Sequence, residues 1–401
     1  MALRRNRDFL LFQAGQLLSS VGSSFSTVAY PLLVLSLTHS APKAGLVAFA
    51  RVLPSPLLGL VAGALADRWD RRALMLGADA IRAVALGALA VLIALDPVFW
   101  PIPLLAFVEG AGDAFFAACT PGAARGIVPA AELPAAVSVQ QARSAAVGIA
   151  GPPVGGALFG VGRAIPFAVD AVSYAASFVS LLAIRTSFQG ARERGPLNMR
   201  AQLAEGFRFL WAQPFLRTTA FIYAVGNFTI PAFLFVVVVV GRADGLSGGQ
   251  IGLLLALFSA FVLVGSLVSG LLRRLLSVRA IMLAELYAGI AVIAYLAWPS
   301  VYVLVAALLP QALVLPVTDS VVIARRIAMT PDRLLGRVEA VRMTLARTAQ
   351  PLGPLVAGLL LGAVSSRATV AVLAVFTIAL ALAGTASRAL RTPPELVEVA
   401  A

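Results

Sequence analysis

The sequence predicts an all-α integral membrane protein with twelve transmembrane helices, arranged as two pseudo-symmetric six-helix bundles. The chain of 401 residues is 60% hydrophobic and only 12% charged, and a water-soluble domain of this length does not hide so much apolar surface. Apolar runs of about 20 residues, the length that crosses the hydrocarbon core of a bilayer, recur along the whole chain. The loops alternate in charge, and the second half repeats landmarks of the first.

Turn signals separate the apolar runs from one another. Examples are Ala41-Pro42, Asp96-Pro97, Trp298-Pro299 and Gly245, because Pro and Gly favour turns over continued helix. The expected spans are 9–37, 44–66, 73–95, 102–121, 139–161, 164–185, 217–241, 248–272, 279–298, 301–324, 340–363 and 367–390.

Positive charge is concentrated in every second loop. The opposite loops hold only Lys43, Arg163, Arg242 and Arg367. By the positive-inside rule this asymmetry predicts that both termini lie in the cytoplasm. The net charge of +13 is thus explained by topology, and no nucleic-acid partner is expected. The basic loops hold twenty arginines: Arg4, Arg5, Arg7, Arg68, Arg71, Arg72, Arg125, Arg192, Arg194, Arg200, Arg208, Arg273, Arg274, Arg279, Arg325, Arg326, Arg333, Arg337, Arg388 and Arg391.

A duplication divides the chain into an N-terminal bundle (1–185), a cytoplasmic linker (186–216) and a C-terminal bundle (217–401). Six residues recur at an offset of 202, so that Gly151 and Pro152, for example, correspond to Gly353 and Pro354. The linker ends in an amphipathic segment that we expect to lie on the membrane surface. Its apolar side carries Leu203, Phe207, Leu210 and Trp211.

The stretch GLVAGALADRWDRR, residues 59–72, is a short charged turn between two apolar runs. It resembles the motif between the second and third helices of the major facilitator superfamily of transporters. The resemblance implies an inner gate, formed here by Gly63, Asp67, Arg68, Arg71 and Arg72. Gly59 and Gly63 lie one turn apart, which predicts close approach of a neighbouring helix. The second half has no acid at the position equivalent to Asp67.

The fifth span contains the run GIAGPPVGGALFG, whose glycines and prolines predict a smooth, closely packed helix face. The run is similar to the Gly-Pro motif of antiporters in this superfamily, which are exporters. Ordinary packing of small residues is the alternative interpretation. The matching residues are Gly148, Gly151, Pro152, Gly155 and Gly156.

Two acids in the fourth span are candidates for proton coupling. Glu109 and Asp113 are four residues apart and therefore share one helix face. Asp113 lies near the middle of the hydrocarbon core, where an ionised carboxylate must be paired, hydrated or protonated. Arg51 lies at a depth close to that of Glu109, so we expect the two to pair and Asp113 to carry the proton. Many superfamily members have an arginine where this chain has Ala106.

Polar side chains in other spans are candidates for lining a central cavity. Gln16, Ser20, Ser23, Thr27 and Tyr30 are spaced by three or four residues and so follow one face of the first span. Interhelical hydrogen bonding is the alternative for each of them. The further candidates are Phe116, Tyr223, Asn227 and Gln311.

Other charged residues within the spans are expected to form structural ion pairs. Asp79 should pair with Arg82 or with the Asp67 turn, and Asp170 with Arg163. Glu285, and Asp319 near Arg325 and Arg326, should form salt bridges at the inner ends of the spans.

These observations favour a proton-coupled secondary exporter of small amphipathic molecules, such as a drug, a macrolide or a siderophore. The chain resembles the macrolide-efflux and enterobactin-exporter branch of the superfamily. A lysolipid flippase or a small-metabolite importer of the same fold is the alternative. We expect no enzyme activity, because a Walker loop and Ser-His or Cys-His sets are missing. We also expect no cofactor and no metal, since the chain has one Cys and one His. A monomer in the plasma membrane is the predicted form.

Overall fold

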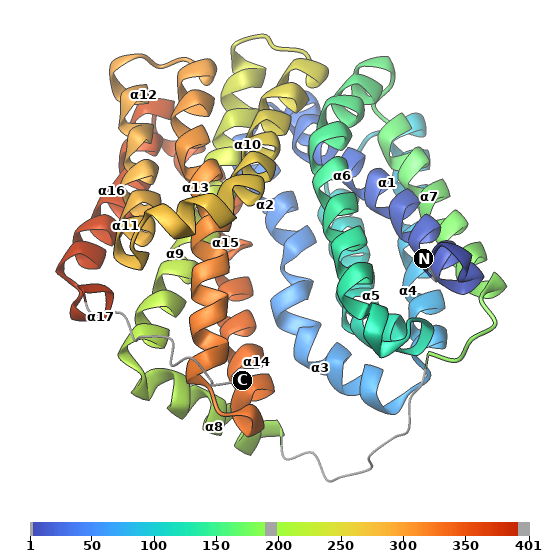
Figure 1. The fold of residues 1–401 in the computed structure, drawn as a ribbon. Coiled ribbons are helices and arrows are strands. Elements are labelled where there is room, and N and C mark those ends of the chain that lie inside the picture. The colour runs from blue at the N-terminus through green and yellow to red at the C-terminus, as the bar shows by residue number, and fades with distance from the viewer. Residues whose placement is uncertain (1–2, 189–198, 392–401) are drawn as a thin grey trace. The chain divides into compact units, whose positions relative to one another are not determined.

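The computed structural model describes residues 3–188 and 199–391, and these residues are almost entirely helical, with no strand (Figure 1). The predicted all-α class is confirmed. Arg192 and Arg194, which we assigned to the cytoplasmic linker, lie outside the described residues.

The chain divides into two compact units. Unit 1 comprises Met1–Arg194 and Gly241–Ala256, and unit 2 comprises Gly195–Val240 and Leu257–Ala401. Unit 1 therefore includes the turn between the seventh and eighth spans. The predicted boundary at residue 217 assigns this turn to the C-terminal bundle instead. The boundaries 1–185, 186–216 and 217–401 stay a prediction.

Unit 1 contains the first six spans. Asn6, Ser40 and Asp70 cap the N-termini of three of its helices by accepting from the backbone N–H three residues ahead. Its helices are α1 (Arg7–Thr38), α2 (Ala41–Val52), α3 (Pro54–Arg68), α4 (Arg71–Leu95), α5 (Pro101–Ile127), α6 (Leu133–Val161) and α7 (Ile165–Ala183), with short 3₁₀ turns η1 (Leu3–Arg5) and η2 (Ala130–Glu132).

The second predicted span is split into α2 and α3 at Leu53. Pro54 and Pro56 follow at once, and a proline removes a backbone donor and clashes with the preceding turn. Pro54 stands at the first position of α3, where a missing N–H is tolerated. The break thus falls just after Arg51, which lies in the last turn of α2.

Unit 2 contains the remaining spans, apart from the ends of α9 and α10 that belong to unit 1. Its elements are α8 (Met199–Ala212), α9 (Pro214–Ala243), α10 (Gly248–Leu275), α11 (Val278–Ala288), η3 (Gly289–Ile293), α12 (Ala294–Ala297), α13 (Val301–Met329), α14 (Asp332–Ala349), α15 (Leu352–Ala363), α16 (Ser366–Ala386) and α17 (Arg388–Arg391).

Eleven helical segments in the described residues are long and apolar enough to cross a membrane. The span predicted at 340–363 is formed by the second half of α14 together with α15, which are separated at Gln350 and Pro351. Neither helix qualifies alone, because α14 is rich in arginine and α15 has only 12 residues.

The predicted amphipathic helix is present as α8, and it packs against α14. Leu210 is buried in the same core as Leu334 and Val338, and Leu203 packs at its edge. Glu205 forms ion pairs with Arg333 (3.3 Å) and Arg337. Its apolar residues therefore face in two directions, because Phe207 and Trp211 stack on each other and remain exposed.

Candidate functional site

The site is centred on an ion pair between α2 and α5 in unit 1. Arg51 Nε donates to Glu109 Oε2 at 2.7 Å, and Arg51 Nη2 donates to Glu109 Oε1 at 3.3 Å. Glu109 is only 1% exposed, so this two-pronged pair is desolvated and strong. Arg51 Nη1 also donates to Thr27 Oγ1 on α1, at 2.9 Å. The predicted pairing is confirmed, while a role in proton coupling stays a prediction.

Tyr174 on α7 connects this pair to a second arginine. Its hydroxyl donates to Glu109 Oε1 at 3.2 Å and accepts from Arg82 Nη2 at 2.7 Å. The same hydroxyl lies 2.7 Å from Ser23 Oγ on α1. The Arg82 guanidinium stacks on the Tyr174 ring, 3.8 Å from its centroid. Five helices, α1, α2, α4, α5 and α7, thus contribute to one polar network.

Asp113 lies at the exposed end of the network. Arg82 Nη2 approaches Asp113 Oδ1 at 3.4 Å, and Arg82 Nη1 approaches the fully buried Asp79 at 3.4 Å. The Asp113 side chain is 60% exposed, in contrast to Glu109 one turn away. Asp113 lies about 18 Å along α5 at 1.5 Å per residue, which is close to the middle of a membrane. It combines a central depth with access to water.

Asp113 opens into a pocket of about 410 Å³. Residues from α1, α4, α5 and α6 line this pocket, and most of them carry a hydroxyl, an amide or an aromatic ring. The size is that of a small-molecule site. The lining consists of Gln16, Ser19, Ser20, Ser23, Arg82, Asp113, Phe116, Ala117, Thr120, Pro121 and Gln140.

The charges in the network do not balance when all groups are ionised. Arg51 and Arg82 bring two positive charges, whereas Glu109, Asp79 and Asp113 bring three negative ones. An uncompensated charge in low-dielectric surroundings is costly. Binding of one proton, or of one cationic group beside Asp113, removes the excess.

The predicted polar face of α1 is only partly in the pocket. Gln16, Ser20 and Ser23 line it, and Thr27 instead contacts Arg51. The predicted cavity position of Tyr30 is wrong. Its side chain is buried, with 1% exposure, and packs edge-on against Phe167 with ring centroids 4.9 Å apart. A tyrosine ring is mostly apolar, so spacing alone does not separate a cavity position from a core position.

The Gly-Pro run holds α6 against two neighbouring helices. A Cβ at Gly151 would overlap the Ser24 side chain, and one at Gly155 would overlap the Phe25 backbone of α1. A Cβ at Gly156 would overlap the Gly248 carbonyl at the start of α10, a residue of unit 1. Gly148 is half-buried. The expected close packing is present; an exporter-specific role for these residues and Pro152 stays a prediction.

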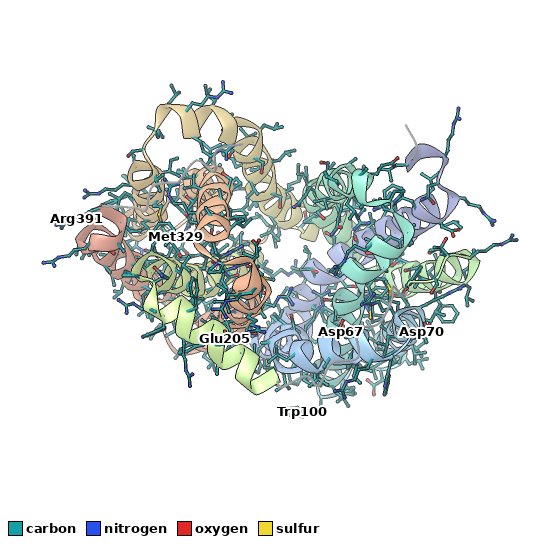
Figure 2. All side chains as sticks on the ribbon, turned by 60° about the horizontal axis from the view of Figure 1, so that its bottom comes forward. Asp67, Asp70, Trp100, Glu205, Met329 and Arg391 are labelled. Carbon is teal, nitrogen blue, oxygen red and sulfur yellow. The ribbon has the colours of Figure 1, made fainter. Side chains whose placement is uncertain are left out.

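The charged turn between α3 and α4, where Figure 2 labels Asp67 and Asp70, is held mainly by Arg71. Its guanidinium donates to the carbonyls of Ala66 (3.1 Å) and Phe188 (3.2 Å) and lies against Gly122 of α5. Asp67 is 65% exposed and lies 3.5 Å from Arg71, a weak surface pair. Arg72 donates to the Leu182 carbonyl at 2.6 Å, and Arg68 is exposed. The gating role of this turn stays a prediction.

The close approach expected at the glycines before this turn is not seen within unit 1 and stays a prediction. Outside the local helix backbone, no heavy atom lies within 4 Å of a Cβ placed on Gly59 or Gly63. Gly265 of α10, which corresponds to Gly59 at an offset of 206, differs, because its Cβ would overlap the Leu313 carbonyl.

Unit 2 has a polar cluster of a different kind. Tyr223 on α9 donates to Asp319 on α13 at 2.6 Å. Arg326 pairs with Glu339 at 2.9 Å, and Arg342 pairs with the same carboxylate at 2.6 Å. Asp319 and Arg326 thus each have another partner, and the expected salt bridge of Asp319 with Arg325 or Arg326 stays a prediction. Glu285 is buried on α11.

The remaining candidates in unit 2 and on α7 have local partners. Asn227 donates to the Tyr223 carbonyl at 2.8 Å, and Gln311 is buried. Neither lines the Asp113 pocket, so their place in a substrate cavity stays a prediction. The expected Asp170–Arg163 pair is wrong, because the buried Asp170 accepts from Ser26 at 2.6 Å and from Ser173 at 3.2 Å.

The contacts from Arg82 to Asp113 and from Tyr174 to Glu109 were not predicted from sequence. Arg82 pairs with Asp79 as expected. Because this partner is only three residues away, the sequence gives no reason to expect that Arg82 also contacts other helices. The sequence does contain a pattern that could have indicated Tyr174. Asp170, Ser173 and Ser177 lie with it on one polar face of α7. Ala106 is buried, and Arg82 brings a guanidinium to α5 from α4.

Comparison with known proteins assigns the family. The family model described as "Transmembrane secretion effector" (MFS_3) matches residues 2–398. The chain belongs to the major facilitator superfamily. It is 30% identical over 386 residues to the multidrug efflux pump Tap of Mycolicibacterium fortuitum, covering 92% of this chain and 93% of that protein.

Two further similarities are consistent with this assignment. Macrolide efflux protein A of Streptococcus pyogenes is 25% identical over 206 residues, half of this chain and 51% of that protein. The crystal structure of a point mutant of the nucleoside transporter NupG has a TM-score of 0.75 at 12% identity, over 96% of this chain and 100% of that one. The latter shows the shared fold alone. The chain is an all-α, multi-pass membrane transporter.

Proposed function

We propose that this protein is a proton-coupled exporter of small amphipathic molecules, including drugs such as macrolides. The observation that carries the proposal is the position of Asp113. It is exposed in a polar pocket at mid-membrane depth and is tied through Arg82 to a buried network with one surplus negative charge.

The network supplies the coupling in this proposal. With Asp113 ionised, the pocket attracts a cationic or polar group of the substrate. With Asp113 protonated, its attraction to Arg82 and to the substrate weakens, and the substrate is released. A proton and a substrate that compete for one carboxylate cannot both be bound, and such competition is the minimal requirement of an antiporter.

The pocket chemistry supports an amphipathic substrate. Phe116 offers an apolar surface, and the side chains of Gln16, Ser20, Ser23 and Gln140 offer hydrogen bonds. The lining thus offers a ligand both hydrogen bonds and an apolar surface. The named relatives are efflux pumps for multiple drugs and for macrolides, which supports export as the direction.

Orientation and assembly are part of the proposal. The positive-inside rule assigns the arginine-rich ends of the bundles, and both termini, to the cytoplasm of a plasma membrane. We propose a monomer, because each unit encloses its own polar cluster and the pocket is complete within unit 1.

Purified protein in liposomes with an acidic interior tests the proposal. Erythromycin is a weak base that enters acidic vesicles passively, so radiolabelled erythromycin, a macrolide, should accumulate inside faster and to a greater extent with the protein than in protein-free liposomes, and a protonophore should stop this protein-dependent accumulation. Ethidium serves as a second, cationic probe. Absence of any pH-dependent flux of either compound would refute export by proton exchange. Flux of a lysophospholipid alone would support the flippase alternative instead.

A further inference from the structure

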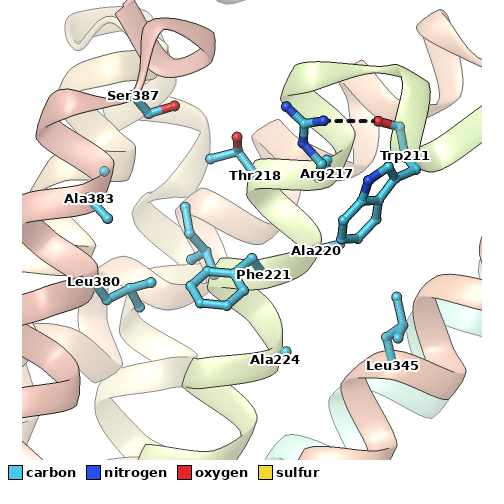
Figure 3. Close-up of a pocket in the computed structure, with 12 residues that line it drawn as sticks. Trp211, Arg217, Thr218, Ala220, Phe221, Ala224, Leu345, Leu380, Ala383 and Ser387 are labelled. Atoms are coloured by element: carbon cyan, nitrogen blue, oxygen red, sulfur yellow. Dashed lines mark hydrogen bonds between the residues drawn. The ribbon is translucent and has the colours of Figure 1, made fainter.

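Unit 2 contains a second cavity, separate from the Asp113 pocket. It has a volume of about 430 Å³ and is lined by twelve residues from α8, α9, α14, α16 and the residue after α16 (Figure 3). All of these residues belong to unit 2. The network around Glu109 does not use them.

The cavity is amphipathic along its length. Figure 3 shows Arg217, Thr218 and Ser387 near one end and Leu380, Phe221 and Ala224 further along. None of the twelve lining residues is acidic. Phe221 is 61% exposed, although a ring of this size is normally buried unless it faces lipid or a ligand.

The polar end lies where a membrane protein meets the headgroups. Arg217 is the fourth residue of α9, so it lies about 4.5 Å from the start of that helix at 1.5 Å per residue. Trp211 stands next to it: Arg217 Nη1 donates to the Trp211 carbonyl at 3.4 Å, and the guanidinium lies 5.8 Å from the indole ring. A paired Trp and Arg at a span end is typical of the interface between lipid tails and headgroups.

Charge on this side of unit 2 favours an anionic occupant. Arg208 of α8 is exposed nearby in sequence, and Ser387 is followed at once by the arginines of α17. Basic pockets between spans on the cytoplasmic side bind anionic lipid headgroups. The lining offers a cationic drug no acidic partner.

We propose that this cavity binds one anionic phospholipid of the inner leaflet, whose phosphate pairs with Arg217 while an acyl chain fills the space along Phe221 and Leu380. The inner-leaflet assignment rests on the cytoplasmic orientation given with the proposed function. Binding of the lipid requires neither a proton gradient nor a transported substrate.

Native mass spectrometry of the purified protein with equal amounts of dioleoyl phosphatidylglycerol and dioleoyl phosphatidylcholine tests this. The wild-type protein should retain phosphatidylglycerol in preference. Arg217→Gln should lower that preference about fivefold, the effect of one cation near an anionic headgroup. Ala383→Phe, which fills the cavity without changing charge, should lower retention of the same lipid.

Arg273→Gln on α10 is the matched control, because it removes the same charge from the same end of the bundle without touching the cavity. Equal phosphatidylglycerol retention by wild type, Arg217→Gln and Ala383→Phe would overturn the proposal. An equal loss in Arg273→Gln would also overturn it, since net charge would then explain the binding. Displacement of the lipid by erythromycin would reassign the cavity to a drug and overturn it as well.

Glycerophosphoglycerol, the headgroup without chains, separates a lipid from a free phosphate. It should fail to displace the lipid, and successful displacement would overturn the role of the acyl chain. These outcomes are independent of transport. A protein that binds lipid but shows no proton-driven flux would contradict the proposed function alone.

Discussion

The two units hold their buried charges in different ways. Unit 1 places two shielded guanidinium groups, Arg51 and Arg82, among three carboxylates and connects them through Tyr174. Unit 2 gives Asp319 a neutral phenol as its partner, and its arginines share the half-exposed Glu339. The first cluster has a carboxylate, Asp113, that is 60% exposed at a pocket, whereas in the second Asp319 accepts from a phenol and Glu285 is buried. The proposed function therefore assigns coupling to unit 1.

The largest expected difference is in transport. Asp113→Asn should abolish accumulation of erythromycin driven by a pH gradient, because the amide keeps the contact with Arg82 but cannot exchange a proton. Exchange of labelled for unlabelled drug without a gradient should persist. Asp319→Asn in unit 2 should change the gradient-driven rate by less than about tenfold, the effect of weakening one hydrogen bond. Intact gradient-driven transport in Asp113→Asn would show that the carrier lies elsewhere.

A stability comparison separates the two clusters next. Glu109→Gln leaves Arg51, whose side chain is 18% exposed, without the carboxylate that is itself only 2% exposed, and should destabilise the protein by about 3–5 kcal/mol. Glu339→Gln removes a partner that is 38% exposed but leaves the buried Arg326 without its charge partner, so it should cost less, about 1–3 kcal/mol. Thermal unfolding in detergent measures both. Similar decreases in unfolding temperature for the two variants would mean that the two units do not differ in how strongly their ion pairs depend on burial.

The fold was largely predictable because the bilayer restricts what the chain can do. Twelve apolar runs and alternating loop charge indicate two bundles without any knowledge of packing. Depth in the bilayer also predicted the pair of Glu109 and Arg51, since both residues lie at similar depth. Contacts of Arg82 and Tyr174 across helices depend on how α4, α5 and α7 rotate against one another, and this rotation is set by packing that the pattern does not encode.

Related glycines in the two units provide a third comparison. Gly59 and Gly265 correspond at an offset of 206, yet only Gly265 lies against a backbone carbonyl. Gly265→Ala should destabilise the protein by about 1–3 kcal/mol through overpacking. Gly59→Ala should stabilise it by up to about 1 kcal/mol, because alanine favours helix over glycine. Equal effects in thermal unfolding would indicate that the equivalence extends to packing.

The smallest expected effect concerns Asp67, which has no acidic equivalent in the second half. Asp67→Asn should change stability by less than about 1 kcal/mol, as for an exposed ion pair. If Asp67 holds an inner gate, the same change should raise labelling of Ala117→Cys about twofold to fivefold, in a Cys119→Ser background. A membrane-impermeant maleimide applied to inside-out vesicles measures the rate.

Asp70→Asn is the matched control for that experiment. Asp70 lies in the same turn and caps α4 through the Ala73 N–H, a role that asparagine also fills. Its labelling rate should equal that of the parent. Unchanged labelling in Asp67→Asn would argue against a gate at this turn.

The hydroxyl of Tyr174 has a single hydrogen but three neighbours, namely Glu109, Arg82 and Ser23. Arg82 only donates, so the phenol hydrogen points either to Glu109 or to Ser23. When Glu109 gains a proton it becomes a donor itself, and the phenol hydrogen turns towards Ser23 at the pocket wall. A change in protonation at Glu109 would thus reach the pocket wall through the O–H bond of Tyr174.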